Sequence, residues 1–291
     1  MKTKKRISGK MIYFSFTIIP VLLYSIFYVF SVISGVRYSF TNWDGMSLKY
    51  DFIGFKNYIA LLKNPNFWGS LKTTICYSVL LVTGVILLSL LLALSLNSLK
   101  KFKTFIKSIY FIPAMIGGIT IALIWDQLFY RVVPLLGQAL NIEWLSQSLL
   151  MTGKTALPAV VFVHIWQAVA LPTVIFIAGL QQIPDEQYES AKIDGATLFQ
   201  EFRYITFPYL LPTLTVNLVL MVKQGFTSFD FPFALTGGGP VRATEVIGIS
   251  IYNDAFKNAR FGMANAEACI LFVLVAIFSL TQLKITSRGG E

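Results

Sequence analysis

The chain has 291 residues, of which 55 % are apolar and 13 % are charged, and its formal net charge is +10. Soluble globular proteins carry about 25 % charged residues, so this composition excludes an ordinary soluble domain and indicates an integral membrane protein. The positive charge is not gathered into a long basic stripe or a base-stacking module. We therefore expect no nucleic-acid partner, and we attribute the charge to cytoplasmic loops rich in Lys and Arg.

Apolar runs long enough to cross about 30 Å of hydrocarbon recur along the chain, and they predict an all-α protein with six transmembrane helices. The first run follows a basic segment and is too long for a signal peptide, so we interpret it as a retained span. The predicted spans cover residues 11–33, 75–96, 108–125, 155–180, 209–231 and 264–283. The predicted domains are a cytoplasmic N-terminus at 1–10, a transmembrane domain at 11–284 and a cytoplasmic tail at 285–291.

The segments between the spans differ in charge and pattern. Residues 97–107 are rich in lysine and are predicted to be cytoplasmic, whereas residues 35–72 and 131–154 are predicted to be external. Apolar residues between 55 and 62 recur at helical spacing, which predicts a short interfacial helix. Proline and glycine residues at 113–118 would permit a kink inside the third span.

Residues 183–208, between the fourth and fifth spans, are both charged and patterned like a helix. Pro184 and Asp185 indicate a helix start, because the positive end of the helix dipole favours acidic side chains. Gly195 predicts the break of that helix, since glycine readily takes the left-handed conformation of a C-terminal cap. Thr197 and Gln200 have the spacing of a capping box that would open a second short helix.

The second helix of this segment is predicted to be amphipathic and to end at Pro208. Its predicted apolar stripe consists of Leu198, Phe202 and Ile205, opposite Gln200, Glu201 and Arg203. A helix–Gly–helix of this kind is too polar for lipid and too apolar on one side for water. We therefore expect it to bind a protein partner.

The same segment closely resembles the EAA loop of permease subunits in binding-protein-dependent ABC importers, whose pattern is E-A-A, x3, G, x9, I-x-L-P. The matching residues are Glu189-Ser190-Ala191, Gly195, Ile205 and Phe207-Pro208. Ser190 replaces the second alanine and Phe207 replaces the leucine, and both changes are modest in size. The resemblance implies that this loop docks into a cleft of a cytoplasmic ATPase. The coupling residues it implies are Glu189, Ser190, Ala191, Asp194, Gly195, Ile205 and Pro208.

Two further segments resemble permeases of the carbohydrate type, as found in maltose and other oligosaccharide importers. One is the sequence of residues 39–74 after the first span, and the other is the stretch Thr236-Gly-Gly-Gly-Pro240 followed by Arg242, Thr244 and Glu245. Three glycines let the backbone turn sharply and approach another surface closely. The resemblance implies that Gly237, Gly238, Gly239 and Pro240 face the translocation path and a docked solute-binding protein.

Polar side chains inside the predicted spans are costly in lipid and by default indicate a transport pathway. The candidates are Trp166, Gln167, Asn217, Lys223, Gln224 and Asp230. Lys223 and Asp230 are seven residues apart, so a continuous fifth span would place them on one face. A sugar suits such a set, because an aromatic face stacks on the ring and amide or charged groups bind hydroxyls. The alternative is that Lys223 and Gln224 only form hydrogen bonds between helices.

The sequence contains no recognisable catalytic or metal-binding motif. Gly153-Lys154-Thr155 lacks the earlier glycine of a phosphate loop, and the lone His164 is more typical of a packed or hydrogen-bonded residue than of a ligand. Cys76 and Cys269 fall inside apolar spans, where a thiol behaves as a small hydrophobe. We therefore expect neither an enzyme nor a cofactor bound by this chain, and energy must come from another subunit or an ion gradient.

The resemblance implies the permease subunit of an ATP-driven sugar importer in a bacterial plasma membrane, with both termini in the cytoplasm. Its implied partners are a second homologous permease, two ATP-binding subunits that hold ATP and Mg, an extracellular solute-binding protein and the sugar. The substrate stays open among raffinose-like or other oligosaccharides, monosaccharides and glycerol phosphates. The alternatives are a gradient-driven secondary transporter, which would need an intramembrane carboxylate relay and inverted repeats, and a membrane scaffold or sensor.

Overall fold

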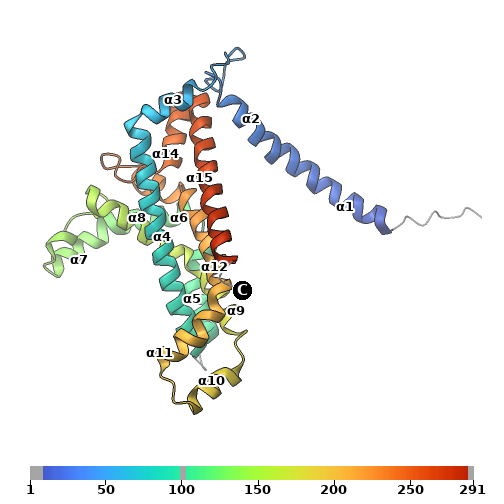
Figure 1. Cartoon of the computed structure of the whole chain (residues 1–291). Helices are drawn as coiled ribbons and strands as arrows, with labels where there is room; N and C mark the ends of the chain where they lie inside the picture. Colours follow the sequence, from blue (N-terminus) through green and yellow to red (C-terminus); the bar gives the residue numbers. More distant parts are fainter. Residues whose placement is uncertain (1–8, 99–102, 288–291) are drawn as a thin grey trace, which may run out of the picture. The chain divides into compact units, whose positions relative to one another are not determined.

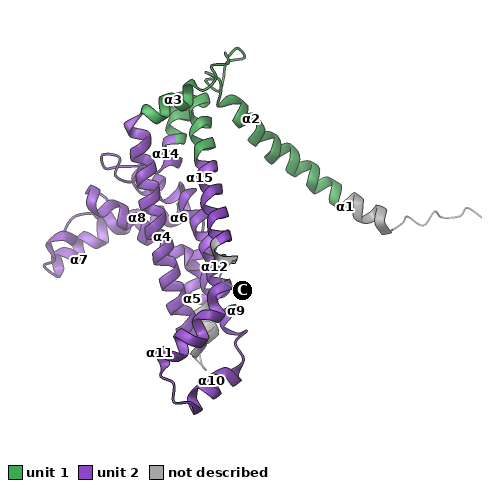
Figure 2. Ribbon diagram, in the orientation of Figure 1, with its two compact units in different colours: residues 1–63, 251–270 green, residues 64–250, 271–291 purple. Residues whose placement is uncertain are grey.

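The computed structural model describes residues 9–98 and 103–287, which are helical except for loops and one isolated antiparallel bridge between Thr41 and Phe52 (Figure 1). Residues 1–8 of the predicted N-terminal segment lie outside the described residues, as do Lys100 and Lys101. Residues 288–291 of the predicted tail also lie outside them. The chain forms two compact units, coloured separately in Figure 2. Unit 1 comprises residues 1–63 and 251–270, and unit 2 comprises residues 64–250 and 271–291.

Unit 1 contains the first span and the loop that follows it. Its elements are α1 (Gly9–Tyr24), the π-helical turn η1 (Ser25–Val29), α2 (Phe30–Tyr38), α3 (Lys56–Lys63), η5 (Asn253–Lys257) and the start of α15 (Phe261–Ser287). Helix α3 confirms the helix predicted from the apolar spacing. Asn57 on α3 donates hydrogen bonds to the carbonyl oxygens of Ser39 and Thr41, 2.9 and 2.8 Å away. These bonds attach α3 to the residues that leave the first span.

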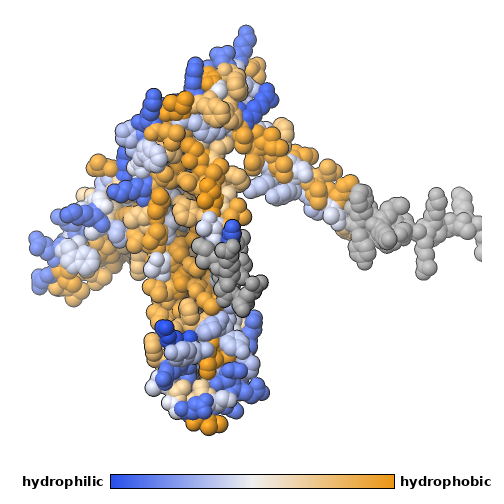
Figure 3. All heavy atoms as spheres, in the orientation of Figure 1, coloured by the Kyte–Doolittle hydropathy of each residue, from blue (hydrophilic) through white to orange (hydrophobic). Residues whose placement is uncertain are grey.

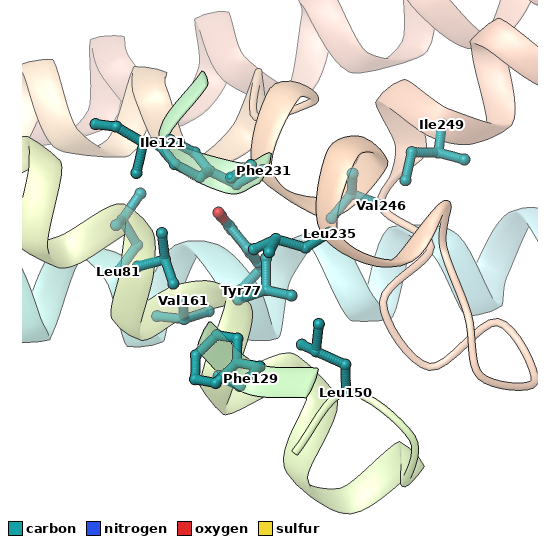
Figure 4. Close-up of a cluster of buried hydrophobic side chains, with 14 of the residues drawn as sticks. Tyr77, Leu81, Ile121, Phe129, Leu150, Val161, Phe231, Leu235, Val246 and Ile249 are labelled. Atoms are coloured by element: carbon teal, nitrogen blue, oxygen red, sulfur yellow. The ribbon is translucent and has the colours of Figure 1, made fainter. Parts of the chain in front are cut away.

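Unit 2 is built around one long helix, α4, which packs against α8, α9 and α12. Its elements in order are α4 (Pro65–Ser98), α5 (Lys103–Met115), α6 (Gly118–Gln127), η2 (Leu128–Val132), α7 (Val133–Ala139), η3 (Glu143–Leu145), α8 (Gly153–Ala168), α9 (Ala170–Leu180), α10 (Asp185–Ile193), α11 (Leu198–Glu201), η4 (Phe202–Thr206), α12 (Phe207–Phe226) and α13 (Asp230–Thr236). Helix α14 (Ile247–Tyr252) and helix α15 cross the boundary between the units. A buried cluster around Tyr77, Leu81 and Phe231 joins α4, α8 and α13 (Figure 4).

Glycine permits a close contact between two helices of unit 2. A Cβ atom built on Gly225 of α12 would lie 2.9 Å from the Cα atom of Ser78 on α4, and a backbone atom cannot move aside easily. Helices α12 and α4 can therefore approach each other this closely only because residue 225 carries no side chain.

Five helical stretches of the described chain are long and apolar enough to cross a membrane, or six if the bent pair α8 and α9 counts as one span. These stretches are Phe16–Tyr38, Pro65–Asn97, Gly118–Ala139, Leu198–Phe226 and Phe261–Gln282, and the bent pair is Gly153–Ala168 with Ala170–Leu180. Apolar side chains cover the long helices of unit 2, and hydrophilic ones gather at its α10–α11 end (Figure 3). The chain is thus a multi-pass membrane protein.

Several predicted span boundaries are wrong. The predicted third span, 108–125, is divided between α5 and α6, because the chain leaves the helix at Ile116 and Gly117. The predicted fifth span, 209–231, ends at Phe226, and α13 begins only after a three-residue break. Apolar residues flank the first break, so the apolar pattern does not show where that helix stops. The second break is flanked by polar residues, which the prediction of one continuous fifth span took as part of the helix.

Candidate functional site

The segment predicted as a helix–Gly–helix has that local structure. Helix α10 ends in a Schellman motif, in which the N–H of Ala196 donates to the carbonyl of Ala191 and the N–H of Gly195 donates to the carbonyl of Lys192. Gly195 has φ = +74°, the left-handed conformation expected of it. Thr197 and Gln200 form the predicted capping box at the start of α11. Each of these features is set by neighbours in the sequence.

One side of this segment is attached to unit 2. The hydroxyls of Tyr188 and Thr206 lie 2.8 Å apart, which joins α10 to the turn that leads into α12. Ile205 and Tyr188 pack against a buried cluster that includes Phe176 and Leu210. A displacement of α10 would therefore act directly on the start of α12 and on α9.

The other side of the segment exposes apolar side chains. Ile193, Leu198 and Phe199 are 86 %, 83 % and 69 % exposed, whereas Glu201 is buried. The predicted stripe is therefore wrong in part: Leu198 lies on the open side with Phe199, and Ile205 faces the protein. Ile205 lies in the π-helical turn η4, whose wider turn shifts its side chain away from the spacing of a regular α-helix.

The predicted helix end at Pro208 is also wrong. Pro208 lies in the first turn of α12, and the helix runs without interruption from Leu198 to Phe226. Proline lacks an N–H, and the wider hydrogen-bonding pattern of η4 precedes it, so proline is accommodated there.

The glycine-rich segment 236–245 is held firmly by hydrogen bonds. Gly237 and Gly238 have φ of +58° and +93°, and the hydroxyl of Thr244 lies 2.6 Å from that of Thr236. Arg242 donates a hydrogen bond to the buried carboxylate of Glu245 in an ion pair of 2.5 Å, and Ser70 of α4 donates to the same carboxylate oxygen at 3.3 Å. This segment is therefore an ordered loop fixed to α4.

Three of the predicted pathway residues line one cavity of about 230 Å³ in unit 2. These are Gln167 of α8, Gln224 of α12 and Asp230 of α13. Asp230 reaches the cavity because the chain breaks after α12, and not because it shares a helical face with Lys223 as predicted. Gln167 is fixed by a 2.8 Å hydrogen bond from its Nε2 atom to the carbonyl of Ile116. Each break in a predicted span thus supplies part of the cavity wall.

The other three predicted pathway residues do not line this cavity. Trp166 packs edge-on against Trp125, with ring centroids 5.6 Å apart. Asn217 is fully buried, and its Nδ2 atom donates to the carbonyl of Pro172 at 3.2 Å. Lys223 is exposed in the last turn of α12, and not in the middle of a span as predicted.

His164 is packed and hydrogen-bonded, as predicted, but its place in the wall of the cavity was not predicted. His164 is 3 % exposed, with Nδ1 2.7 Å from the hydroxyl of Tyr77 and Nε2 2.8 Å from the amide nitrogen of Gln224. An amide nitrogen can only donate, so Nε2 accepts and the ring is a neutral tautomer whose Nδ1–H donates to Tyr77. Phe231 stacks on the imidazole at 4.6 Å. His164 thereby holds α4, α8, α12 and α13 together.

Ser228 is a cavity residue that sequence reasoning missed. It lies in the break between α12 and α13, is 7 % exposed and lines the cavity. No sequence motif indicates such a residue, because its position depends on where α12 ends. Across the described part of the chain, no three or more His, Cys, Asp or Glu side chains come together as a metal ion would require.

The membrane-length helices define a multi-pass helical membrane protein, and comparison with known families shows to which family it belongs. Residues 67–288 match the family described as the binding-protein-dependent transport system inner membrane component. The chain belongs to this family.

Several relatives resemble the chain over nearly its whole length. It is 40 % identical over 286 residues to the multiple sugar-binding transport system permease protein MsmF of Streptococcus mutans, covering 98 % of this chain and 99 % of the relative. It is 32 % identical to the probable starch degradation products transport system permease protein AmyD of Thermoanaerobacterium thermosulfurigenes, covering 99 % and 98 %. The fold matches a chain of a bacterial ABC transporter involved in the import of the acidic polysaccharide alginate, with a TM-score of 0.81, 21 % identity and 96 % coverage of each chain.

Proposed function

We propose that this chain is the permease subunit of an ATP-driven importer that moves a sugar into the cell by alternating access. The sugar we propose is an oligosaccharide. Family membership and relatives named for sugar and starch-product transport support this proposal. The chain pairs with a second homologous permease and receives its substrate from an extracellular solute-binding protein. Two ATP-binding subunits on the cytoplasmic side bind ATP and Mg and supply the energy.

The observation that carries this proposal is the exposed apolar surface formed by Ile193, Leu198 and Phe199, on a segment that is otherwise fixed to unit 2. An exposed apolar patch that adjoins charged residues is typical of a protein-binding surface. We assign it to the ATP-binding subunit, which places residues 183–208 and both termini in the cytoplasm. Closure of the ATP-binding subunits displaces α10. The Tyr188–Thr206 hydrogen bond and the contacts of Ile205 transmit that movement to α12 and α9.

Docking can be tested by co-purification. Leu198→Asp places a charge on the proposed interface and is expected to reduce recovery of the ATP-binding subunit at least tenfold. Leu48→Asp is the matched control, since Leu48 is 98 % exposed in a different loop. Equal recovery with both variants would refute docking at this surface.

Coupling can be tested at Gly195 in vesicles that contain the complete importer. A Cβ atom at residue 195 meets no atom within 4 Å, so a substitution acts through the left-handed backbone and not through a clash inside this chain. Gly195→Val is expected to lower the ratio of sugar taken up to ATP hydrolysed at least tenfold while the protein remains inserted. Gly195→Asn, which tolerates the left-handed region, retains the ratio. A normal ratio for the valine variant would contradict the assigned role.

A further inference from the structure

The cavity in unit 2 carries a single charge. Asp230 is the one charged side chain among the described residues that line it, and Lys223, next to Gln224, is exposed outside the lining. Within the described part of the chain, the Asp230 carboxylate forms no side-chain hydrogen bond and no ion pair. The buried Ser228 lines the same cavity, and its hydroxyl, which lies near that of Tyr77, has capacity for a further hydrogen bond. Two polar groups of the cavity are therefore available to bind a ligand.

Asp230 also lies at a position that favours negative charge. A Cβ atom built on Gly118, the first residue of α6, would be 3.5 Å from Oδ2 of Asp230. The carboxylate thus lies beside the N-terminus of α6, where free N–H groups and the helix dipole attract an anion. The N-cap residue Gly117 provides no side-chain cap there. The protein's own carboxylate takes the place that an acidic group of a substrate would otherwise take.

We propose that Asp230 is a specificity-determining residue that makes this cavity select an uncharged, polyhydroxylated ring over an anionic one. This inference rests on the proposed function, because it names the class of solute that the permease accepts. The Asp230 carboxylate accepts hydrogen bonds from sugar hydroxyls, and such charge-assisted bonds are roughly twice as strong as neutral ones. Ser228, Gln167 and Gln224 bind further hydroxyls of the same ring.

The size of the cavity agrees with a single sugar ring. Its volume of about 230 Å³ is below the roughly 300–1,000 Å³ of pockets that enclose a drug-sized ligand. One ring of an oligosaccharide therefore occupies the cavity at a time. An anionic ring in the same place meets the Asp230 carboxylate at short range, and the repulsion between two such charges near a protein surface lowers its affinity by roughly tenfold to a hundredfold.

The test measures protection of an introduced thiol in the complete importer, in detergent and without ATP. Thr227→Cys supplies the thiol, because Thr227 is exposed and lines the cavity. The native thiols of this chain are removed by Cys76→Ser and Cys269→Ser, and labelling is measured on this chain. The neutral probes are glucose, galactose, raffinose and maltotriose, and the anionic probes are galacturonate and trigalacturonate. We expect at least one neutral sugar to slow thiol labelling at a concentration at least tenfold lower than its anionic counterpart.

The charge of Asp230 is then removed. Asp230→Asn is expected to reduce this preference about tenfold by improving protection by the anionic probes. Asp126→Asn is the matched control, since Asp126 is a carboxylate on α6 outside the cavity lining, and it should leave the preference unchanged. Absence of protection by every neutral probe, equal protection by neutral and anionic probes, or an unchanged preference in Asp230→Asn would each overturn the proposal.

The outcome can be separated from that of the proposed function. The labelling experiment needs no ATP, whereas the proposed function is tested by ATP-dependent uptake and by the Gly195 variants. If uptake is driven by ATP and the protection results fail, the charge selectivity of the cavity is wrong and the importer assignment stands. If neutral sugars protect selectively and uptake does not need ATP, the importer assignment fails and the selectivity stands.

Discussion

The hydroxyl of Tyr77 lies 2.7 Å from Nδ1 of His164, and this buried hydrogen bond joins helices α4 and α8 across 87 residues of sequence. The same imidazole meets Gln224 through its other nitrogen and Phe231 through its face. Gln224 and Phe231 also line the cavity that contains Asp230. Packing of the bundle and the shape of the cavity thus depend on one histidine.

Removing the Tyr77 hydroxyl is expected to destabilise the protein. Tyr77→Phe leaves the Nδ1–H of His164 buried without an acceptor, which costs about 1–3 kcal/mol. The apparent melting temperature of the detergent-solubilised protein should therefore fall. Tyr24→Phe is the control, because Tyr24 is 58 % exposed, and its melting temperature should match that of the wild type. A Tyr77→Phe protein as stable as the control would show that the hydrogen bond adds nothing to stability.

The features predictable from sequence are those set by near neighbours. Gly195, Thr197 and Gln200 predict a cap and a capping box because each acts within a few residues, and the structure has both. The apolar runs predict membrane-length helices for the same reason. They do not show a break such as the one at Gly117, because the residues around it are as apolar as those within a span.

The cavity could be predicted only in part. Gln167, Gln224 and Asp230 were recognisable as polar residues in apolar surroundings, which is a local property. The sequence predicts that His164 is packed or hydrogen-bonded, but it does not place His164 or Ser228 in the cavity, since a lone histidine or serine has no distinctive spacing. Their roles arise from contacts among α4, α8, α12 and α13, and these contacts depend on helix packing that no short stretch of sequence encodes.

The close approach of α12 to α4 leads to a second prediction. Gly225→Ala places a methyl group 2.9 Å from the Cα atom of Ser78, and this overpacking should cost about 1–3 kcal/mol. Gly69→Ala on α4 is the matched control, since a Cβ atom there meets no atom within 4 Å. That change should stabilise the helix by about 0.5–1 kcal/mol because alanine has the higher helix propensity. Melting temperatures that shift in the same direction for both variants would contradict the contact.

The loop after the first span supplies a pH-dependent prediction. The side-chain hydroxyl of Ser47 and the N–H groups of Ser47 and Met46 donate hydrogen bonds to Asp44, which lowers the pKa of that carboxyl from 3.8 to about 2. A lowered pKa means that the ionised form stabilises the folded loop. This stabilisation is complete above the unfolded pKa of 3.8 and is lost as the pH falls through about 2.

Hydrogen exchange at the Met46 and Ser47 amides measures this effect. After correction for the intrinsic pH dependence of exchange, protection should be constant from neutral pH to about 4 and should then fall towards pH 2. Asp44→Asn should weaken protection at neutral pH and remove its dependence on pH, because the amide cannot ionise. Asp51→Asn, a change in the same loop that leaves these bonds intact, should keep the wild-type profile. Loss of protection already near neutral pH in the wild type would show that another group holds this turn.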